Sequence, residues 1–322
     1  MRAYALVADG AEAAFHDVPC PVAAEGEVLV RVAAASLNPH DAAVRSGDAA
    51  RYMNYRYPVV LGSDFAGVIE AVGEGVNDLQ PGDRVFGLVR ELVAARGSLA
   101  PLVAVPRDWV AVTPPSLSDA DAGVLGLAAL GALRCTDAIE PLSAGQVVLV
   151  NGATGGIGGY VIQLLAERGV HVIATSRAGE EEEYVRALGA AETVNWKTAD
   201  LPVVVASRHP SGVDAIVDLV TPDHASLTRL ARAILRRGGR LVSTRHAVAL
   251  DDLPDMRGEN LLITVDGGAL NRIARHAASG VLEAPHVTTF DFETVEDAFD
   301  AMGAGIRGKI AVRLAHHSRP KN

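Results

Sequence analysis

An apolar run that leads straight into three evenly spaced glycines constrains this fold more than any other feature of the chain. Residues 147–150 are Val-Val-Leu-Val, and Gly152, Gly155 and Gly158 follow at intervals of three, before a helical pattern over 156–168. A continuous apolar run is typical of a strand that is buried on both faces. Glycine at this spacing permits a tight turn and lets the backbone approach a pyrophosphate, whose charge a helix N-terminus favours.

This strand–turn–helix pattern predicts a dinucleotide-binding loop, and the alternative is a turn that is rich in glycine for structural reasons alone. The alternation of strand and helix patterns after the loop favours the first interpretation. The residues expected to contact the cofactor phosphates are Gly152, Ala153, Thr154, Gly155, Gly156, Ile157 and Gly158.

The same alternation predicts a parallel, doubly wound sheet. Strands are expected at 170–175, 193–196, 214–219 and 240–244, and helices at 180–188 and 224–236. One further strand is expected at 261–265, then helices at 268–279 and 294–304, and a strand at 309–314. Residues 1–118 instead show short strand patterns between Gly and Pro turns, which indicates a small barrel or sandwich. The length of 322 residues fits two domains.

The residues after the second expected strand bear on the choice of cofactor. An NAD site usually has Asp or Glu there, which accepts a hydrogen bond from the ribose 2′-hydroxyl. This chain has Thr175, Ser176 and Arg177. Two hydroxyls and a guanidinium suit a 2′-phosphate and favour NADPH, although Arg177 could also be an ordinary solvated residue. Four acids at 180–183 are suited to a helix N-terminus, and they place negative charge near the expected phosphate.

The composition argues against several classes of protein. The 39 acidic and 29 basic residues give a net charge of −10, which disfavours a nucleic-acid binder. Only Cys20 and Cys135 are cysteines, which excludes a disulfide scaffold and cysteine-rich zinc modules. Apolar stretches are too short to span a membrane, and Asp9 interrupts the N-terminus too early for a signal peptide. We therefore expect a cytoplasmic, reduced protein with no nucleic-acid or membrane partner.

Four further motifs accompany the glycine loop. Residues 37–41 are Leu-Asn-Pro-His-Asp, 62–67 are Gly-Ser-Asp-Phe-Ala-Gly, 81–85 are Pro-Gly-Asp-Arg-Val and 308–310 are Gly-Lys-Ile. Together they resemble the medium-chain dehydrogenase/reductase superfamily and, within it, the zinc-independent quinone oxidoreductase (ζ-crystallin-like) branch. The resemblance covers nearly the whole chain.

This resemblance implies an α/β fold with two domains. A GroES-like β-barrel catalytic domain would comprise residues 1–118 and 267–322, and a Rossmann domain with a doubly wound parallel sheet would comprise 119–266. Relatives are commonly dimers or tetramers in which the last Rossmann strand pairs across a two-fold axis. Here that strand would be 261–265, which predicts a homodimer with a tetramer as the alternative, unless the strand is covered within one chain.

The resemblance also bears on metal chemistry. Zinc-dependent relatives have a Cys and a His as catalytic ligands where this chain has Asn38 and Ser63, and the segment between 86 and 102 has no Cys. No metal site is therefore expected, because catalytic zinc needs three protein ligands. Without a Lewis acid, the expected reaction is hydride transfer from NADPH to a quinone or an α,β-unsaturated carbonyl, both of which delocalise the resulting charge.

Candidate catalytic residues follow from the family pattern. By position, Asn38 would lie near the nicotinamide and orient the substrate or the carboxamide, or it could only stabilise the turn before Pro. Asp41 either braces that turn or acts on the substrate. The family's tyrosines are Ala43 and Ala49 here, so Tyr52 is the candidate phenol, with Tyr55 and Tyr57 as neighbours; each could also be a packed or surface residue. By position, Trp196 contacts the adenine or packs in the core.

Two other functions remain open at this stage. The unusual substrate-side residues also suit a specialised enoyl or enone reductase that acts on a pathway or carrier-bound intermediate. The glycine loop alone would also suit a non-catalytic NADPH-binding protein with a sensing or structural role.

Overall fold

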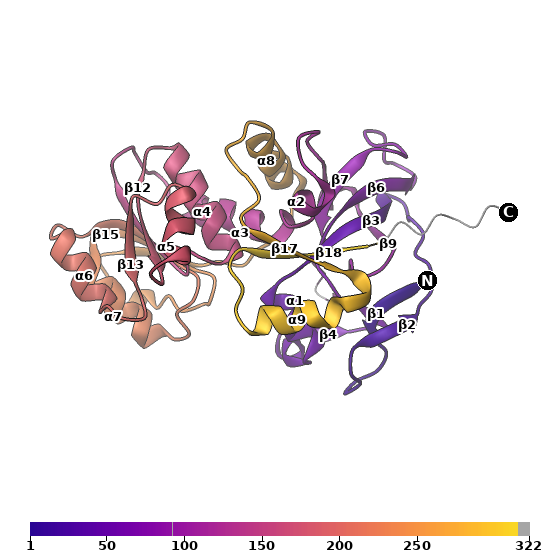
Figure 1. Cartoon of the computed structure of the whole chain (residues 1–322), viewed down its shortest axis with the longest axis horizontal. Helices are drawn as coiled ribbons and strands as arrows, with labels where there is room; N and C mark the ends of the chain where they lie inside the picture. Colours follow the sequence, from indigo (N-terminus) through magenta and orange to yellow (C-terminus); the bar gives the residue numbers. More distant parts are fainter. Residues whose placement is uncertain (92, 315–322) are drawn as a thin grey trace. The chain divides into compact units, whose positions relative to one another are not determined.

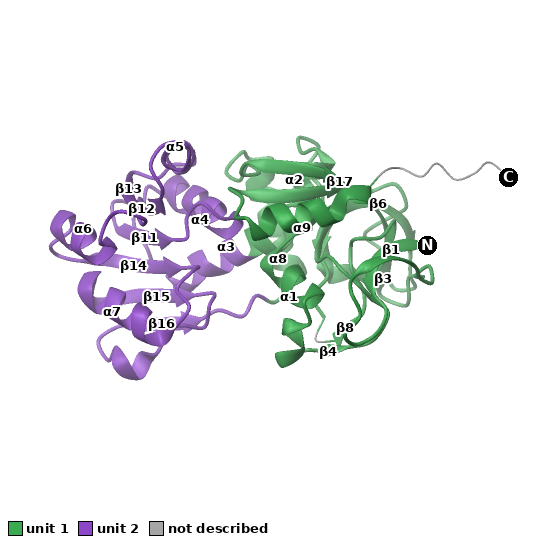
Figure 2. Cartoon of the chain, turned by 60° about the horizontal axis from the view of Figure 1, so that its bottom comes forward, with its two compact units in different colours: residues 1–130, 264–322 green, residues 131–263 purple. Residues whose placement is uncertain are grey.

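The computed structural model describes residues 1–91 and 93–314. These residues form two compact units: unit 1 comprises Met1–Leu130 and Thr264–Asn322, and unit 2 comprises Gly131–Ile263 (Figure 2). The segment that closes unit 1 therefore comes from the far end of the sequence. The functional domain boundaries expected at residues 118 and 266 stay a prediction, because the units are defined by packing alone.

Unit 2 is built on a parallel sheet in the order β13-β12-β11-β14-β15-β16. The strands are β11 (Val147–Asn151), β12 (His171–Ser176), β13 (Glu192–Asn195), β14 (Val213–Asp218), β15 (Leu235–Ser243) and β16 (Arg257–Asn260). Counted along the chain, this is the order 3-2-1-4-5-6 of a doubly wound Rossmann sheet. The chain changes direction across the sheet between β11 and β14, which is where such sheets bind ligands.

In unit 2, a helix follows each of the strands β11, β12, β13 and β14 along the chain (Figure 1). They are α4 (Gly156–Glu167), α5 (Glu180–Ala187), α6 (Leu201–Arg208) and α7 (His224–Ile234). In α7 the buried residues Leu227, Leu230 and Ile234 recur at the three-to-four-residue spacing that makes one apolar face. Helix α6 was not expected from the sequence; Asp200 caps it by accepting a hydrogen bond from the backbone N–H of Val203.

The expectation of a strand at 261–265 was wrong for the single chain. The last strand is β16 (Arg257–Asn260), and residues 261–265 carry no regular secondary structure. The N–H of Leu261 still donates to the carbonyl of Ser243, but Leu262 is exposed. A strand exists only where a second backbone supplies hydrogen bonds, so an apolar sequence alone does not make this segment a strand.

Unit 1 is mostly antiparallel. One sheet has the order β10-β7-β6-β3-β18-β17, with β9 also paired to β3. Its strands are β3 (Glu27–Leu37), β6 (Asp64–Val72), β7 (Arg84–Leu88), β9 (Leu102–Pro106), β10 (Val110–Val112), β17 (Val287–Asp291) and β18 (Lys309–Arg313). The smaller sheets are β2-β1-β5 and β4-β8, formed by β1 (Arg2–Leu6), β2 (Ala14–Asp17), β5 (Val59–Val60), β4 (Asn54–Tyr55) and β8 (Val93–Ala94).

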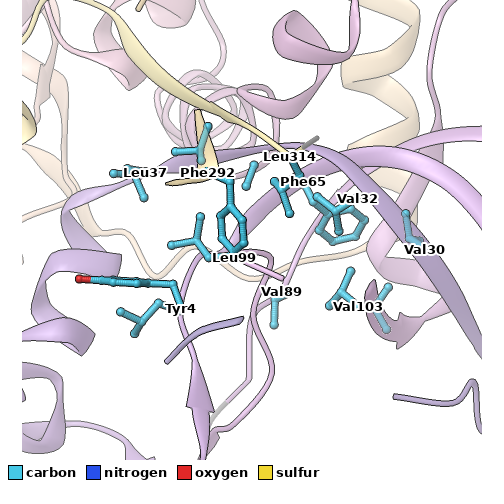
Figure 3. Close-up of a cluster of buried hydrophobic side chains, with 14 of the residues drawn as sticks. Tyr4, Val30, Val32, Leu37, Phe65, Val89, Leu99, Val103, Phe292 and Leu314 are labelled. Carbon is cyan, nitrogen blue, oxygen red and sulfur yellow. The ribbon is translucent and has the colours of Figure 1, made fainter. Parts of the chain in front are cut away.

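The end of the described chain is part of the unit 1 barrel. Strand β18 pairs antiparallel with β3, with Ile310 opposite Leu37 and Val312 opposite Ala35 (Figure 1). The core they share is shown in Figure 3, where Phe292 and Leu314 from the late segment lie among early residues such as Phe65. Helices α8 (Gly267–Ala278) and α9 (Val295–Gly303) complete this late segment, and residues 315–322 of the expected domain lie outside the described chain.

Three helices complete the description. Helix α1 (Pro39–Arg45) follows β3 directly, α2 (Asp119–Gly123) packs on β3 and β6, and α3 (Gly126–Ala138) crosses from unit 1 into unit 2. Among the described residues, no helix is long and apolar enough to cross a membrane.

Candidate active site

The glycine loop joins β11 to α4, and two of its glycines are required by close packing. Gly152 has a φ of +89°, and its N–H donates to Thr175 Oγ1 at 2.9 Å. At Gly158, a Cβ atom would lie 2.5 Å from the carbonyl oxygen of Gly152. The helix can therefore begin this close to the strand only because position 158 has no side chain.

Gly155 differs, because a Cβ there would make only one contact, at an ordinary van der Waals distance. Its nearest neighbour would be the Gly152 carbonyl oxygen at 3.6 Å. Gly155 is the N-cap of α4, and it offers no side-chain cap to the first turn. The first N–H groups of a helix lack intrahelical partners and favour an anion. The loop thus provides donors, positive potential and room for a pyrophosphate beside Gly155.

A buried aspartate that the sequence analysis missed braces this loop. Asp218 ends β14, and its Oδ1 accepts hydrogen bonds from Asn151 Nδ2 at 2.8 Å and Thr221 Oγ1 at 2.6 Å. Burial raises the pKa of Asp218, although its hydrogen bonds oppose that effect. Asn151 immediately precedes Gly152, so this network fixes the start of the loop. The only available signal was an Asp at the carboxyl end of a buried strand.

The three residues expected around a 2′-phosphate differ in their burial and in their contacts. Thr175 and Ser176 are buried, and Thr175 braces the loop through Gly152. Arg177 is exposed, and its Nε donates to Glu181 Oε1 at 2.7 Å. The backbone N–H of Arg177 donates to the other oxygen of Glu181 at 2.6 Å. Glu181 therefore holds the only one of the three side chains that reaches solvent.

Trp196 follows β13, and its backbone N–H donates to the Ser176 carbonyl at 3.2 Å. Its side chain is 54% exposed. The alternative that Trp196 packs in the core is therefore wrong. Contact with the adenine stays a prediction.

In unit 1, five residues form what we call the buried polar cluster: Asn38, Asp41, Ser63, Asp64 and Lys309, each at most 5% exposed. Asn38 is the N-cap of α1, and Asp41 Oδ2 accepts a hydrogen bond from its backbone N–H at 2.7 Å. Ser63 Oγ donates to Asp41 Oδ1 at 2.6 Å. The expected bracing role of Asp41 is therefore present, because its carboxylate ties the start of α1 to the segment before β6.

A buried ion pair completes the cluster. Lys309 Nζ lies 2.5 Å from Asn38 Oδ1 and 3.4 Å from Asp64 Oδ2. Asp64 also accepts hydrogen bonds from Asn38 Nδ2 at 2.9 Å and from the backbone N–H of Leu127 at 2.6 Å. These contacts orient the Asn38 amide at both ends: its oxygen accepts from Lys309 and its nitrogen donates to Asp64. Lys309 is visible in the sequence as part of a family motif, but the motif does not reveal this contact.

Burial raises the pKa of Asp41 to about 6. The nearby Asp64 carboxylate adds to this effect, whereas the hydrogen bonds from Ser63 and Asn38 and the charge of Lys309 oppose it. A carboxyl group that titrates this close to neutral pH is unusual and marks the cluster as a candidate functional site.

Tyr52 is 62% exposed and belongs to a second group that includes His40 and Arg90. Arg90 NH1 lies 3.2 Å from His40 Nε2, and His40 Nδ1 lies 3.4 Å from the Tyr52 hydroxyl. Burial and the Arg90 charge lower the pKa of His40 to about 4, so the ring is neutral near pH 7. Because a guanidinium only donates, Nε2 accepts, the ring proton is on Nδ1, and Nδ1–H points to the Tyr52 oxygen.

The two neighbouring tyrosines are engaged elsewhere. The Tyr55 hydroxyl donates to the Val44 carbonyl at 3.1 Å, and the Tyr57 hydroxyl donates to Asp9 Oδ1 at 3.4 Å. Of the three phenols, Tyr52 alone is exposed and contacts a titratable ring. The structure thus gathers Asn38 and Asp41 in one cluster and Tyr52 in an adjoining one, since His40 lies between Asn38 and Asp41 in the sequence.

Comparison with known proteins gives matches along most of the chain. The family model described as alcohol dehydrogenase GroES-like domain matches residues 24–115, and the one described as zinc-binding dehydrogenase matches 156–248. The chain is 30% identical over 305 residues to the chloroplastic NADPH-dependent alkenal/one oxidoreductase of Arabidopsis thaliana, covering 92% of this chain and 74% of that protein. It is 29% identical over 273 residues to the quinone oxidoreductase of Mus musculus, covering 83% and 80%.

A solved structure shows the same fold over nearly the full length. The quinone oxidoreductase from Coxiella burnetii superposes with a TM-score of 0.85, covering 98% of this chain and 99% of that chain, at 24% identity. The expected fold class, a GroES-like barrel with a Rossmann domain, is confirmed.

Proposed function

This chain belongs to the medium-chain dehydrogenase/reductase superfamily, in its quinone oxidoreductase branch, and from that premise we propose that it uses NADPH, without zinc, to reduce a quinone or an α,β-unsaturated carbonyl. It is an oxidoreductase that binds a nicotinamide cofactor. The observation that carries the proposal is the N-terminus of α4 at Gly155, which no side chain caps and where a Cβ would meet only the Gly152 carbonyl oxygen at 3.6 Å; such a helix start suits a pyrophosphate.

The choice of NADPH depends on Arg177. Its guanidinium is the exposed cation at the end of β12, where a 2′-phosphate is read in this fold. Glu181 competes for the same guanidinium, so the phosphate would have to displace or share it. The Arabidopsis relative is named as NADPH-dependent, which supports the same choice. Adenine contact by Trp196 and phosphate contact by residues 152–158 belong to this proposal.

The name of the matching family model includes zinc, but the residues here do not fit a catalytic zinc ion. Asn38 and Ser63 replace the Cys and His ligands of zinc-dependent relatives. The Ser63 hydroxyl is already committed to Asp41, and the Lys309 ammonium lies 2.5 Å from Asn38 Oδ1. A second cation beside a buried ammonium would be repelled in a medium of low dielectric. We therefore propose no zinc-dependent step.

The bound nicotinamide would supply a hydride, and the chain itself would then have to stabilise and protonate the reduced substrate. Hydride addition to an enone leaves an enolate, and hydride addition to a quinone leaves a hydroquinone anion; each needs one proton. We propose that Tyr52 donates it, because its oxygen faces His40 Nδ1–H and its own O–H is free to point to solvent or substrate. Solvent would restore the Tyr52 proton.

In this proposal Asn38 positions the substrate or the carboxamide, and Asp41 is a positioning residue that holds α1 in place. The amide of Asn38 has little rotational freedom, because Lys309 and Asp64 engage its two ends. A preorganised amide costs no further ordering when the ligand binds.

We also propose that the chain is a cytoplasmic homodimer, with residues 1–118 and 267–322 as catalytic domain and 119–266 as cofactor domain. Two free cysteines, one of them exposed, fit a reducing compartment. Exposed Leu262 in the apolar segment 261–265 fits a strand that forms only when a second copy supplies its partner.

The decisive assay follows NADPH oxidation with 1,4-naphthoquinone and with small enones. We expect turnover with at least one acceptor, and much lower turnover with NADH. If only carrier-bound enones react, the specialised reductase is the correct alternative. If NADPH binds tightly and no acceptor of any kind reacts, the chain is a binding protein and the proposal is wrong.

The role of Tyr52 is tested separately. Tyr52→Phe is expected to lower kcat by about 100-fold or more with an enone acceptor while the KM for NADPH stays unchanged. Tyr57→Phe is the matched control, because the Tyr57 hydroxyl donates to Asp9 and not to the histidine. Equal kcat for Tyr52→Phe and Tyr57→Phe would assign proton donation to water.

A further inference from the structure

Three side chains with metal-ligating atoms converge at the edge of the unit 2 sheet opposite the glycine loop. His171 Nε2 lies 2.7 Å from Glu192 Oε1, and His209 Nε2 lies 2.9 Å from the same oxygen. The two imidazole centroids are 5.8 Å apart. One ligand atom from each residue lies within 4.8 Å of the other two.

The fold holds these residues on three separate elements. His171 is the first residue of β12, Glu192 is the first residue of the edge strand β13, and His209 is the C-cap of α6. Ile173 pairs with Glu192 in the parallel ladder, and the N–H of His209 donates to the Val205 carbonyl at 2.8 Å. The backbone therefore sets the convergence, although 17 to 38 residues separate the members along the chain.

Two imidazoles and one carboxylate are a donor set that suits zinc. Both histidines present Nε2, and each Nε2–H donates to Glu192 Oε1. An ion would replace these two protons, because a ring nitrogen coordinates zinc only when it carries no proton, and each neutral ring would then keep its proton on Nδ1. Bonds of about 2.0–2.2 Å in a tetrahedron place ligand atoms about 3.3 Å apart. The two Nε2–Oε1 contacts would have to open by about half an ångström, and the two Nε2 atoms, which lie within 4.8 Å of each other, would have to reach the same spacing.

We propose that His171, Glu192 and His209 bind one divalent transition-metal ion of the Zn²⁺ type, with water as the fourth ligand. The side chains are partly exposed, at 37%, 24% and 16%, which gives the ion access from solution. The ion would join β12, β13 and the end of α6, and so stabilise the edge of the sheet. The site lies at the amino ends of the strands, whereas the glycine loop lies at their carboxyl ends, so the proposal does not depend on reductase activity.

One feature of the surroundings opposes a cation. Arg208 NH1 lies 3.3 Å from Glu192 Oε2, the oxygen that the histidines do not contact. Its positive charge would weaken metal binding without blocking it, because Oε1 remains the shared oxygen. This gives the proposal a second, independent test: Arg208→Gln should bind the ion more tightly than the parent chain.

The test is titration of metal-free protein with Zn²⁺ by calorimetry, and with Co²⁺ by visible absorption. Every protein carries His316→Ala and His317→Ala, because two adjacent histidines bind Zn²⁺ by themselves. We expect one ion per chain, with Co²⁺ bands of tetrahedral intensity. His171→Ala and His209→Ala should each weaken binding by more than the roughly 10- to 100-fold that loss of an outer-shell partner costs. His224→Ala, at an exposed position at the start of α7, is the matched control and should not change affinity.

Heating provides a readout that needs no spectroscopy. Zn²⁺ should raise the unfolding temperature of the parent chain and of His224→Ala, but not that of Glu192→Gln/His209→Ala. The proposal is overturned if Zn²⁺ does not bind, or if binding survives in His171→Ala/His209→Ala. In either case the three residues are a hydrogen-bonded cluster only.

Discussion

The glycine loop of unit 2 and the buried polar cluster of unit 1 prepare a site by opposite means. The loop works through backbone groups, and the fold requires that Gly152 and Gly158 have no side chain. The polar cluster works through buried side chains, in which the Lys309 ammonium faces the Asp64 carboxylate and the Ser63 hydroxyl donates to Asp41. The loop therefore depends mainly on its glycines, with Thr175 and Asp218 as braces, whereas the polar cluster depends on side chains that come from distant parts of the sequence.

The strongest test of this contrast is to remove the cation of the cluster. Lys309→Met should lower the free energy of unfolding of unit 1 by about 3–5 kcal/mol, because Asp64 is left buried without its counter-charge. Fluorescence of Trp109 reports on unit 1 once Trp196, the other tryptophan, is replaced by Phe. Denaturant titration in that background gives the change.

Two further variants test whether the uncompensated charge of Asp64 causes the loss of stability. Lys309→Met/Asp64→Asn should recover much of the loss, because the uncompensated charge is gone. Arg2→Met, which breaks an exposed ion pair with Glu293, should cost less than about 1 kcal/mol. Equal losses for Lys309→Met and Arg2→Met would show that the buried pair is not special.

The same contrast explains what the sequence could predict. The loop lies within seven consecutive residues, so its spacing and its flanking strand and helix are visible directly in the sequence. Strand and helix positions from β11 to β15 were predicted to within a few residues for the same reason, apart from α6 and an early start of β15 at Leu235. The pairing of Lys309 with Asp64 spans 245 residues. No periodicity or motif spacing encodes such a contact, because it exists only after β18 pairs with β3.

Two other residues show the same limit. Arg177 was identified from its position, but its capture by Glu181 depends on how α5 begins. His40 was visible inside a family motif, yet its connection to Tyr52 and Arg90 needed the fold. At 261–265 the sequence predicts a strand that the single chain does not form. An apolar pattern suits a strand, but it does not supply the neighbouring strand with which to pair.

A second prediction breaks the loop instead of the cluster. Gly155→Val should weaken NADPH binding by at least about 100-fold, because the side chain fills the space expected for the pyrophosphate. Losing two charge-assisted hydrogen bonds at about 1.5–3 kcal/mol each accounts for that size. The fold should persist, since Gly155 has a φ of −81° that any residue adopts. Fluorescence titration with NADPH measures the effect.

The control for Gly155→Val is Gly303→Val, at a position where a Cβ meets nothing within 4 Å. It should bind NADPH as the parent chain does. Retained affinity in Gly155→Val would place the pyrophosphate elsewhere.

A third prediction concerns the pH dependence of stability. It applies to the polar cluster and not to the glycine loop, because the loop has no titratable side chain. Asp41 has its pKa raised from 3.8 to about 6, so between these values the folded chain keeps a proton that the unfolded chain has lost. The stability of unit 1 should therefore fall as pH rises through this window, by about 3 kcal/mol for a shift of this size. Asp41→Asn should remove this slope.

The measurement compares unfolding free energies of Asp41→Asn and its parent from pH 4 to pH 7, again through Trp109. The difference between the two should move in favour of Asp41→Asn as pH rises. A constant difference, or one that moves the other way, would mean that Asp41 titrates at the same pH in the folded and unfolded chain.

The smallest expected effects concern the exposed pair at the end of β12, where a side chain does contribute to the loop region. Arg177→Ala should raise the KM for NADPH roughly 10- to 100-fold more than the KM for NADH, because only NADPH has a 2′-phosphate to lose. Glu181→Gln should act in the opposite direction and lower the KM for NADPH a few-fold, because it removes the carboxylate that pairs with the Arg177 guanidinium. Arg186→Ala, which breaks the neighbouring pair with Glu182 on the same helix, is the control and should leave both constants unchanged. If Glu181→Gln instead raises the KM for NADH, then Glu181 accepts from a ribose hydroxyl, and the cofactor preference of this chain is for NADH.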